Sequence, residues 1–210
     1  MPERVALQVL VATGNPGKRA EMERLLRAHL PDVVVLGLPD VEAYDEPVED
    51  APDFAGNALL KARAGLAATG LPTVADDSGL CVDALNGMPG VLSARWSGQP
   101  KSDERNNRLL LEQLADVPDE RRGAHFTCAV AFVHPTAGEH VVEGHMAGRV
   151  GREVRGGGGF GYDVLFEADD APGRTTAELT REQKDAISHR GHALREIAPY
   201  VAEVLARSEG

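Results

Sequence analysis

Apolar residues recur along this chain in short runs, separated by longer segments in which they follow a helical period. The run Val5 to Ala12 predicts a buried strand, and Thr13 to Lys18 predicts the turn from that strand into a helix. A second short run, Val33 to Leu36, predicts another strand. The helix between them is expected to bury one stripe of side chains: Met22, Leu25, Leu26 and His29.

A polar loop and a second helix come next. Glu42 to Asp53 contains two prolines and no apolar period, so we expect a loop, with Asp53 capping the helix that follows. Gly70 ends that helix. Its buried positions recur at helical spacing: Ala58, Ala62 and Leu66. The apolar run that follows predicts a strand that ends at Asp76 and Asp77, with a separate strand over Leu80 to Ala84.

The second half of the chain mixes a helix with a hairpin. Gly87 to Gly98 predicts an irregular connection, and Ser102 caps a helix that runs to Leu114. The turn Pro135 to Gly138 then separates two strands, the second over His140 to Met146. The first strand of this hairpin is indicated by alternating large residues: Phe126, Cys128, Val130 and Phe132.

The C-terminal part is predicted to be helical. Thr180 and Gln183 form a capping box, and Ser188 caps a last helix that Pro199 is expected to kink or divide. The buried stripe of this helix is Leu194, Ile197, Val201 and Val204. Helices and strands that alternate at both ends of a central hairpin predict an α/β protein with a mixed sheet and a single domain over residues 1–210.

Composition excludes several functions. A formal net charge of -11 disfavours passive binding to a nucleic-acid polymer, whereas a small phosphorylated ligand is acceptable if cations or a divalent metal are concentrated in one place. Cys81 and Cys128 are too few for a disulfide framework. Val5 to Ala12 is too short to span a membrane, and no secretory pattern precedes it. We therefore expect a cytoplasmic protein with no membrane partner.

The candidate chemistry begins with Val74-Ala75-Asp76-Asp77-Ser78-Gly79. Neighbouring strand side chains point to opposite faces, so Asp76 and Asp77 cannot both aim into one pocket unless the backbone bends. One acid is expected to act and the other to support it. An ordinary turn is the alternative, because Asp, Ser and Gly also close turns.

Two segments are candidates for phosphate binding. Thr13 to Lys18 is a glycine-containing turn that enters a helix, where backbone N–H groups and Lys18 favour an anion, although a tight turn with a surface lysine is equally compatible. It does not match the Walker A pattern. Asn57 and Lys61 share one helix face behind an acidic loop, and an ordinary solvated helix surface is the alternative.

Two later segments suit a planar ligand. The glycines of Gly156 to Asp163 allow close backbone approach, and Phe160 and Tyr162 could stack on a ring or simply anchor the loop in the core. Lys184 to Arg190 places two cations and His189 at a helix entrance, which favours anion or carbonyl recognition. His189 and His192 have a spacing that could ligate a metal, but zinc is disfavoured because no third ligand type lies near them in the sequence.

Together these motifs resemble the inosine/xanthosine triphosphate pyrophosphatase family, over Ala12 to Leu194. The resemblance implies Mg2+-dependent hydrolysis of ITP, dITP and XTP to the monophosphate and pyrophosphate. It also implies a homodimer and a long central mixed β-sheet with flanking helices, in two lobes around a nucleotide-binding cleft.

The resemblance also assigns roles by position. Glu49 and Asp77 would serve the metal, Asp77 would be the general base, and Ser78 would touch the substrate. The ring would meet Phe160 on its face. Phosphate contacts are implied for Thr13, Gly14, Asn15, Pro16, Gly17, Lys18 and Lys61. Contacts with the edge of the base are implied for Asp163, Lys184, His189 and Arg190, and substrate binding is also implied for Gly161 and Tyr162.

Four positions depart from the family pattern. Asp53 stands where threonine is usual and Gly56 where an acid is usual, while Val154 and Val164 replace prolines beside the glycine loop. The changes at Asp53 and Gly56 motivate one alternative, a nucleotide-binding sensor without turnover. A related house-cleaning pyrophosphatase with a different base preference is a further alternative.

Overall fold

The computed structural model describes residues 7–207, which fall into two compact units. The first unit comprises residues up to Asp77 with Ala129–Glu143 and the chain from Ala193 onward. The second unit comprises Ser78–Cys128 and Gly144–His192. Three strands and the last helix pass from one unit into the other along the chain. None of the helices in residues 7–207 has the length and hydropathy needed to cross a membrane.

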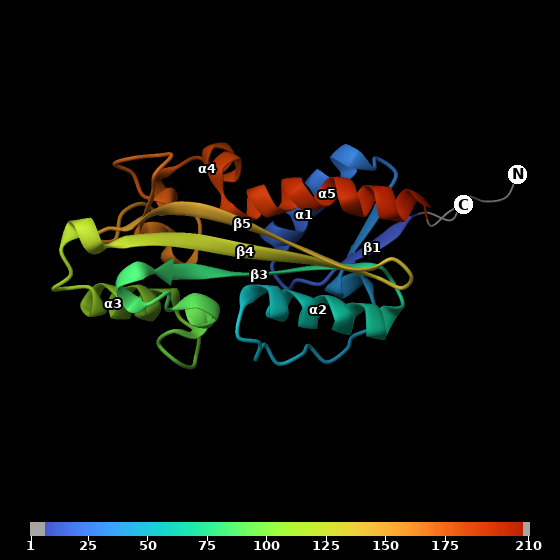
Figure 1. Cartoon of the computed structure of the whole chain (residues 1–210), viewed down its shortest axis with the longest axis horizontal. Coiled ribbons are helices and arrows are strands. Elements are labelled where there is room, and N and C mark those ends of the chain that lie inside the picture. Colours follow the sequence, from blue (N-terminus) through green and yellow to red (C-terminus); the bar gives the residue numbers. More distant parts are fainter. Residues whose placement is uncertain (1–6, 208–210) are drawn as a thin grey trace, which may run out of the picture. The chain divides into compact units, whose positions relative to one another are not determined.

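The first unit begins with two parallel strands. β1 (Gln8–Val11) pairs with β2 (Val34–Gly37) and with the start of β3 (Thr73–Val82). Val5 and Ala6, the start of the predicted first strand, lie outside the described residues. Figure 1 shows helices α1 (Pro16–His29) and α5 (His189–Arg207) on one side of these strands and α2 (Phe54–Thr69) on the other.

Side-chain caps begin the helices of this unit. The Asn15 side chain accepts hydrogen bonds from the backbone N–H groups of Gly17 and Lys18, at 2.9 and 3.2 Å. Asp53 caps α2 as predicted, and Gly70 ends it with φ of 71°. In α1, Met22 and Leu26 are buried, but His29 is exposed, so its place in the buried stripe was wrong.

β3 corrects the predicted end of the acidic strand. A single ten-residue strand runs through Asp76 and Asp77 to Val82, in place of two strands separated by a turn. Asp, Ser and Gly favour turns when their polar groups are satisfied locally. Here the two carboxylates are instead satisfied by side chains from distant helices, so the strand continues through them.

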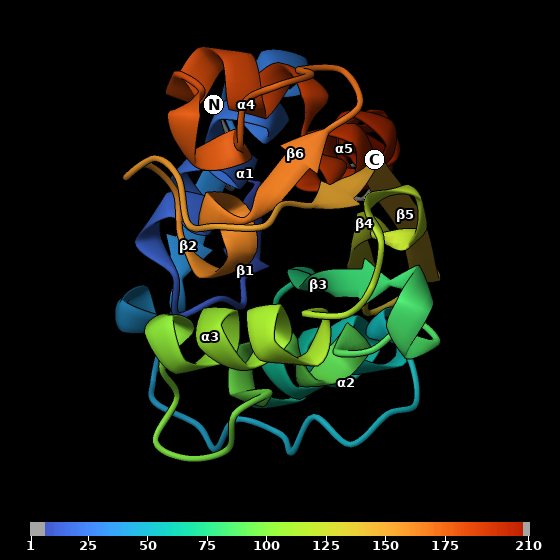
Figure 2. The same cartoon turned by 90° about the vertical axis from the view of Figure 1, so that its left-hand side faces the viewer.

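The second unit contains α3 (Asp103–Gln113) and α4 (Arg181–Ile187), which Figures 1 and 2 show on opposite sides of its strands. Ser102 caps α3 and the Thr180 capping box begins α4, both as predicted. Short 3-10 turns complete both units: η1 (Leu38–Asp40), η2 (Asp83–Leu85), η3 (Gly90–Arg95), η4 (Asp119–Arg121), η5 (Gly161–Val164) and η6 (Thr176–Glu178).

One six-stranded sheet has the order β2-β1-β3-β4-β5-β6. The predicted hairpin is confirmed as β4 (Gly123–His134) and β5 (Gly138–Val150). β5 pairs antiparallel with β6 (Phe166–Ala168), a strand that the pattern did not predict because only three residues form it. Parallel and antiparallel pairs in one sheet confirm the α/β class with a mixed sheet.

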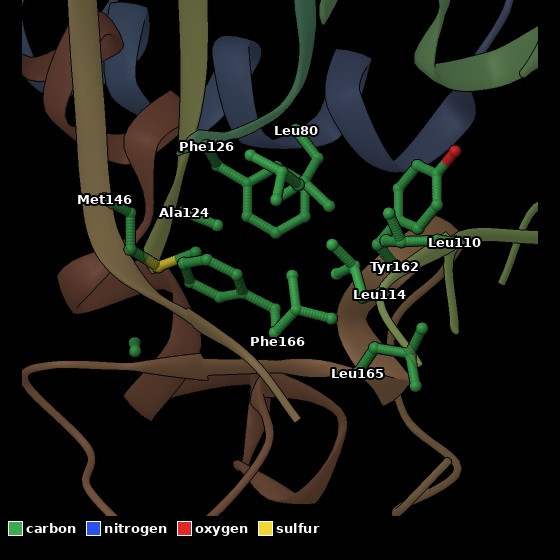
Figure 3. Packing of buried hydrophobic residues seen from close by; sticks show 12 residues of the cluster. Leu80, Leu110, Leu114, Ala124, Phe126, Met146, Tyr162, Leu165 and Phe166 are labelled. Atoms are coloured by element: carbon green, nitrogen blue, oxygen red, sulfur yellow. The ribbon is translucent and has the colours of Figure 1, made fainter. Parts of the chain in front are cut away.

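Apolar side chains from β3, β4, β6 and α3 form the core of the second unit. Figure 3 shows Phe126 and Phe166 at its centre, with ring centroids 4.8 Å apart and edge to face. Leu80, Leu110 and Leu114 are fully buried around them. This core provides the support on which the glycine loop rests.

The C-terminal helix α5 is confirmed, with the four predicted stripe residues buried. The Ser188 hydroxyl oxygen accepts the Gly191 N–H at 3.0 Å, so the predicted cap is also confirmed. The helix runs continuously through Pro199, however, so of the two expected effects, a kink or a division, the division is wrong. Packing of the stripe on both sides of the proline holds the helix together.

Candidate active site

The buried acid Asp76 holds the lysine of the first turn. Its side chain is fully buried, and Lys18 Nζ donates to Asp76 Oδ2 at 2.8 Å. The cap formed by Asn15 fixes the start of α1 and therefore the position of Lys18. Asp76, whose role was open from the sequence, is thus the anchor of this lysine.

The turn before α1 is less open than the sequence suggested. Asn15 Oδ1 already accepts from the N–H groups of Gly17 and Lys18, two donors that were predicted to be available to phosphate. The ammonium group of Lys18 is therefore the principal anion-binding group that this turn offers. Phosphate binding by Thr13, Gly14 and the rest of the turn stays a prediction.

The second acid, Asp77, lies in a network with three residues of the α2 region. Lys61 Nζ contacts Glu49 Oε1 at 2.7 Å and Asp77 Oδ1 at 3.3 Å. The side-chain amide of Asn57 donates to Asp77 Oδ2 at 3.1 Å. Both oxygens of Asp77 therefore have a fixed donor, and one lysine joins the two predicted metal ligands.

The two acids face opposite sides of β3. Asp76 meets Lys18 from α1, whereas Asp77 meets Lys61 from α2, and Figure 1 places these helices on opposite sides of the strands. This is the division that strand alternation predicts for adjacent residues. The structure therefore brings Glu49, Lys61 and Asp77 together and separates Asp76 from them.

Electrostatics make Asp77 a better proton acceptor than an ordinary carboxylate. Burial raises the pKa of Asp77 and Glu49 adds to the increase, while Lys61 and Asn57 offset only part of it. Burial alone would lower the pKa of Lys61, but Asp77, Glu49 and Asp76 outweigh it and raise that pKa. Lys61 therefore stays charged beside a carboxylate whose ionised form is destabilised.

Two of the unusual residues build the start of α2 together. Asp53 Oδ1 accepts the Gly56 N–H at 2.7 Å. A Cβ atom at Gly56 would lie 2.6 Å from the Cβ of Ala51, closer than real contacts allow. Ala51 N–H in turn donates to Asn57 Oδ1 at 3.0 Å, so the acidic loop is tied to the residue that holds Asp77.

In the second unit, Asp163 organises the glycine loop from inside. Its carboxylate is buried and accepts from the Phe160 N–H and the Thr176 hydroxyl, both at 2.9 Å. Lys184 forms an ion pair with it as well. Thr176 was not predicted, although the Thr175-x-x-Glu178 spacing, which forms a capping box here, marks the turn that carries it.

The two loop aromatics have different positions. Phe160 is 53% exposed, whereas Tyr162 is 4% exposed and its hydroxyl donates to Ser93 O at 3.0 Å. Stacking of the Tyr162 ring on a ligand, considered from the sequence, is therefore wrong for this conformation. The ring is an anchor in the core seen in Figure 3, and stacking is left to Phe160.

Two cations lie beside the exposed ring. Lys184 Nζ is 5.2 Å and the Arg190 guanidinium carbon 5.9 Å from the Phe160 ring centroid. Arg190 also reaches the Ser78 hydroxyl at 3.4 Å. His189 is buried and stacks on Phe126 with centroids 4.9 Å apart. The structure thus brings Phe160, Lys184 and Arg190 together, as the sequence suggested, and joins Arg190 to Ser78, whereas His189 faces Phe126 of the core.

Each unit thus carries its own group of polar side chains. In the first unit, Glu49, Lys61 and Asp77 offer two carboxylates and a cation, a set that suits a metal and phosphate. In the second unit, Phe160, Lys184 and Arg190 offer an exposed ring and two cations, a set that suits a planar ring with polar edges.

The chain belongs to the Ham1 family, whose family model matches residues 9–200. The dITP/XTP pyrophosphatase of Nocardia farcinica is 57% identical over 203 residues, covering 96% of this chain and 98% of that protein. The dITP/XTP pyrophosphatase of Corynebacterium glutamicum is 52% identical over 206 residues, covering 96% and 100%.

Solved structures agree with this assignment. The nucleoside-triphosphatase / dITP/XTP pyrophosphatase of Mycobacterium abscessus is 53% identical, with a TM-score of 0.77 over 91% of this chain and 99% of that one. The Ham1 protein of Staphylococcus aureus is 34% identical, with a TM-score of 0.84 over 94% and 99%. The predicted family and fold class are confirmed.

Proposed function

We propose that this protein hydrolyses dITP, XTP and ITP to the nucleoside monophosphate and pyrophosphate, which removes deaminated purines from the nucleotide pool. The observation that carries the proposal is the placement of Asp77, whose two oxygens are held by Lys61 and Asn57. Its chemistry matches the activity named for the relatives that align with nearly the whole chain.

The donor set fits Mg2+. Glu49 and Asp77 contact the same ammonium group, that of Lys61, at 2.7 and 3.3 Å, so a single bridging cation already joins the two carboxylates. No group of three or more His, Cys, Asp or Glu side chains in residues 7–207 is arranged to hold a metal ion. Mg2+ commonly uses one or two carboxylates and completes its shell with water and substrate phosphates.

When bound, Mg2+ would neutralise phosphate charge and polarise the phosphate that is attacked. Asp77 accepts a proton from water as the water oxygen forms a bond to the α-phosphorus. The bond from that phosphorus to the α–β bridging oxygen breaks, and pyrophosphate leaves with the electron pair. The raised pKa of Asp77 favours its role as the acceptor.

Lys18 and Lys61 supply the positive charge that the leaving group needs. Each is largely buried, with 17% of its side chain exposed, and each is aimed by a carboxylate of β3. Fixed cations in a partly dry site stabilise developing negative charge more than mobile surface lysines do. Asp76 therefore contributes by orienting Lys18.

Recognition of the base is assigned to the second group. Phe160 offers an exposed face for stacking, and Lys184 and Arg190 lie at its edge as donors. Hypoxanthine and xanthine carry a carbonyl where adenine carries an amino group, so donors favour the former. Asp163 serves the base indirectly, because its oxygens already hold Lys184 and the loop.

A panel of triphosphates with Mg2+ tests the proposal. We expect pyrophosphate release from dITP, ITP and XTP at rates far above those for ATP and GTP. Orthophosphate as the first product would contradict the reaction, and equal turnover of ATP would contradict the base assignment. Preference for a modified or pyrimidine nucleotide would favour the house-cleaning alternative.

The sensor alternative loses its motivation in the structure. It rested on Asp53 and Gly56, which here form a helix cap together and leave Asn57 and Lys61 on Asp77. Tight ITP binding without pyrophosphate release would restore it. The homodimer, the cytoplasmic location and the single enzyme domain over residues 1–210 stay predictions, the first of which light scattering of the purified protein would test.

A further inference from the structure

Helix α3 holds both backbone polar groups of one loop glycine. Asp103 Oδ2 accepts the Gly161 N–H at 2.7 Å, and the Asn107 side-chain amide donates to Gly161 O at 2.9 Å. The two side chains are four residues apart, so they share one face of the helix.

We call the pair Asp103 and Asn107 the clamp, and its effect comes from the position of Gly161 in the loop. Gly161 has φ of 62°, in the left-handed region that favours glycine, and holding a glycine in one conformation costs backbone entropy. Its N–H belongs to the peptide bond with Phe160, and its carbonyl to the peptide bond with Tyr162. Fixing both groups sets the planes of both peptides and hence the direction from which the Phe160 ring leaves the loop.

Asn107 has little other structural use. It is 6% exposed, and no residue of the described chain donates to its Oδ1. The cost of burying the amide is therefore offset by the Gly161 bond alone. Its neighbour Asn106 differs, since its side chain bonds Ser93 O, Ala94 O and the Ser97 N–H and organises η3.

We infer that Asp103 and Asn107 are positioning residues for base recognition, acting through Gly161 on Phe160. Both residues act on the backbone of Gly161, and their effect on the Phe160 side chain is indirect. The inference rests on the proposed function, in which Phe160 stacks on the base. Because the clamp sets how the ring is presented, its loss weakens substrate binding and leaves the chemistry at Asp77 intact.

The first test compares Asp103→Ala, Asp103→Asn and Asn107→Leu in steady-state pyrophosphate release from ITP. We expect KM to rise about five- to tenfold for Asp103→Ala and Asn107→Leu, which corresponds to the free energy of one lost hydrogen bond. We expect kcat to stay within about twofold of wild type. Asp103→Asn keeps an oxygen acceptor and stays near wild type. Glu104→Ala and Glu104→Gln are matched controls, because Glu104 is an exposed acid in the same helical turn.

The double variant Asp103→Ala/Asn107→Leu sharpens the test. Because both side chains act on one residue, its KM is expected to rise less than the product of the two single effects. Unchanged KM in both single variants would overturn the inference. An increase in KM for Asp103→Asn equal to that for Asp103→Ala would also overturn the inference, because the side-chain oxygen that accepts the Gly161 N–H would then not matter.

Hydrogen exchange separates this inference from the proposed function. Amides of residues 156–164 should exchange faster in Asp103→Ala and Asn107→Leu than in Glu104→Ala, whatever the enzyme turns over. Unchanged exchange would refute the clamp directly. If the wild-type protein fails to release pyrophosphate while exchange responds as expected, the proposed function fails. Asp103 and Asn107 then hold the loop without a role in base recognition, and the inference as stated is overturned.

Discussion

The two groups of functional residues differ in charge and in the kind of structure that carries them. In the first unit, three carboxylates pair with two lysines, so negative charge is in excess: Asp76 pairs with Lys18 on one side of β3, and Glu49 and Asp77 share Lys61 on the other. Around Phe160, two cations, Lys184 and Arg190, lie beside the ring, and Lys184 pairs with the carboxylate of Asp163. The first arrangement favours a divalent cation, and the second favours carbonyl oxygen.

The supporting structure differs in the same direction. Apart from Glu49, which lies in the loop before α2, the acids and lysines of the first group project from a long strand and two helices, whereas Phe160 stands on a glycine loop that side chains hold in place. Regular elements fix reacting groups more accurately than loops do. We therefore expect changes in the first group to affect kcat and changes in the second group to affect KM.

The largest effect is expected for Asp77→Asn. Loss of the proton acceptor and of a metal ligand should lower kcat for dITP about 10³-fold. Stopped assays of pyrophosphate release will measure it, with Asp116→Asn, an exposed acid, as the control. Near-normal turnover by Asp77→Asn would remove the distinction between the two groups.

A smaller effect is expected for Lys61→Ala. Removing one fixed cation beside Asp77 should lower kcat roughly 10²-fold. Arg63→Ala is the matched control, because Arg63 lies on the same helix and has its own carboxylate partner, Glu139, at 2.7 Å on the surface. Exposed ion pairs contribute little, so Arg63→Ala should keep full activity. Equal losses in both variants would mean that helix stability explains the result.

Phe160→Ala should act mainly on binding. Base stacking on an aromatic ring contributes about 1–3 kcal/mol, so KM for ITP should rise about tenfold or more while kcat changes little. Val154→Ala removes another exposed apolar side chain near the same loop and serves as the control. If kcat falls and KM does not change, Phe160 acts in the chemical step, which would contradict the expectation that the second group affects KM.

The smallest expected effect is on stability without metal. The raised pKa of Asp77 means that its ionised form disfavours the folded state, and this penalty is relieved as the pH falls through that pKa. In EDTA at neutral pH, Asp77→Asn should therefore unfold about 1–4 °C above wild type, with the gap closing on acidification. A gap that widens in acid would contradict the sign of the pKa shift.

Much of the fold could be predicted because its signals are local. The caps at Asp53, Ser102, Thr180 and Ser188 each depend on residues within three positions, and all four are present. The end of the acidic strand was misjudged for the opposite reason. Asp76 is satisfied by Lys18, 58 positions away, and no local pattern reveals such a partner.

The site shows the same limit. Strand alternation was enough to predict that Asp76 and Asp77 divide their roles, and the motif order was enough to predict the family. The pair Asp103 and Asn107 was not predicted from the sequence. Both bond the backbone of Gly161, and backbone N–H and carbonyl groups are the same at every such position, so no residue pattern indicates these contacts. Tyr162 was ambiguous because burial depends on packing from the whole unit.

The packing around Gly56 limits how this chain can change over time. Any side chain at position 56 would force Ala51 aside and disturb the loop that meets Asn57. An acidic residue introduced there alone should therefore be harmful in this background. The loop around position 51 has to change first, so the order of substitutions, as well as their identity, decides which variants of this protein remain viable.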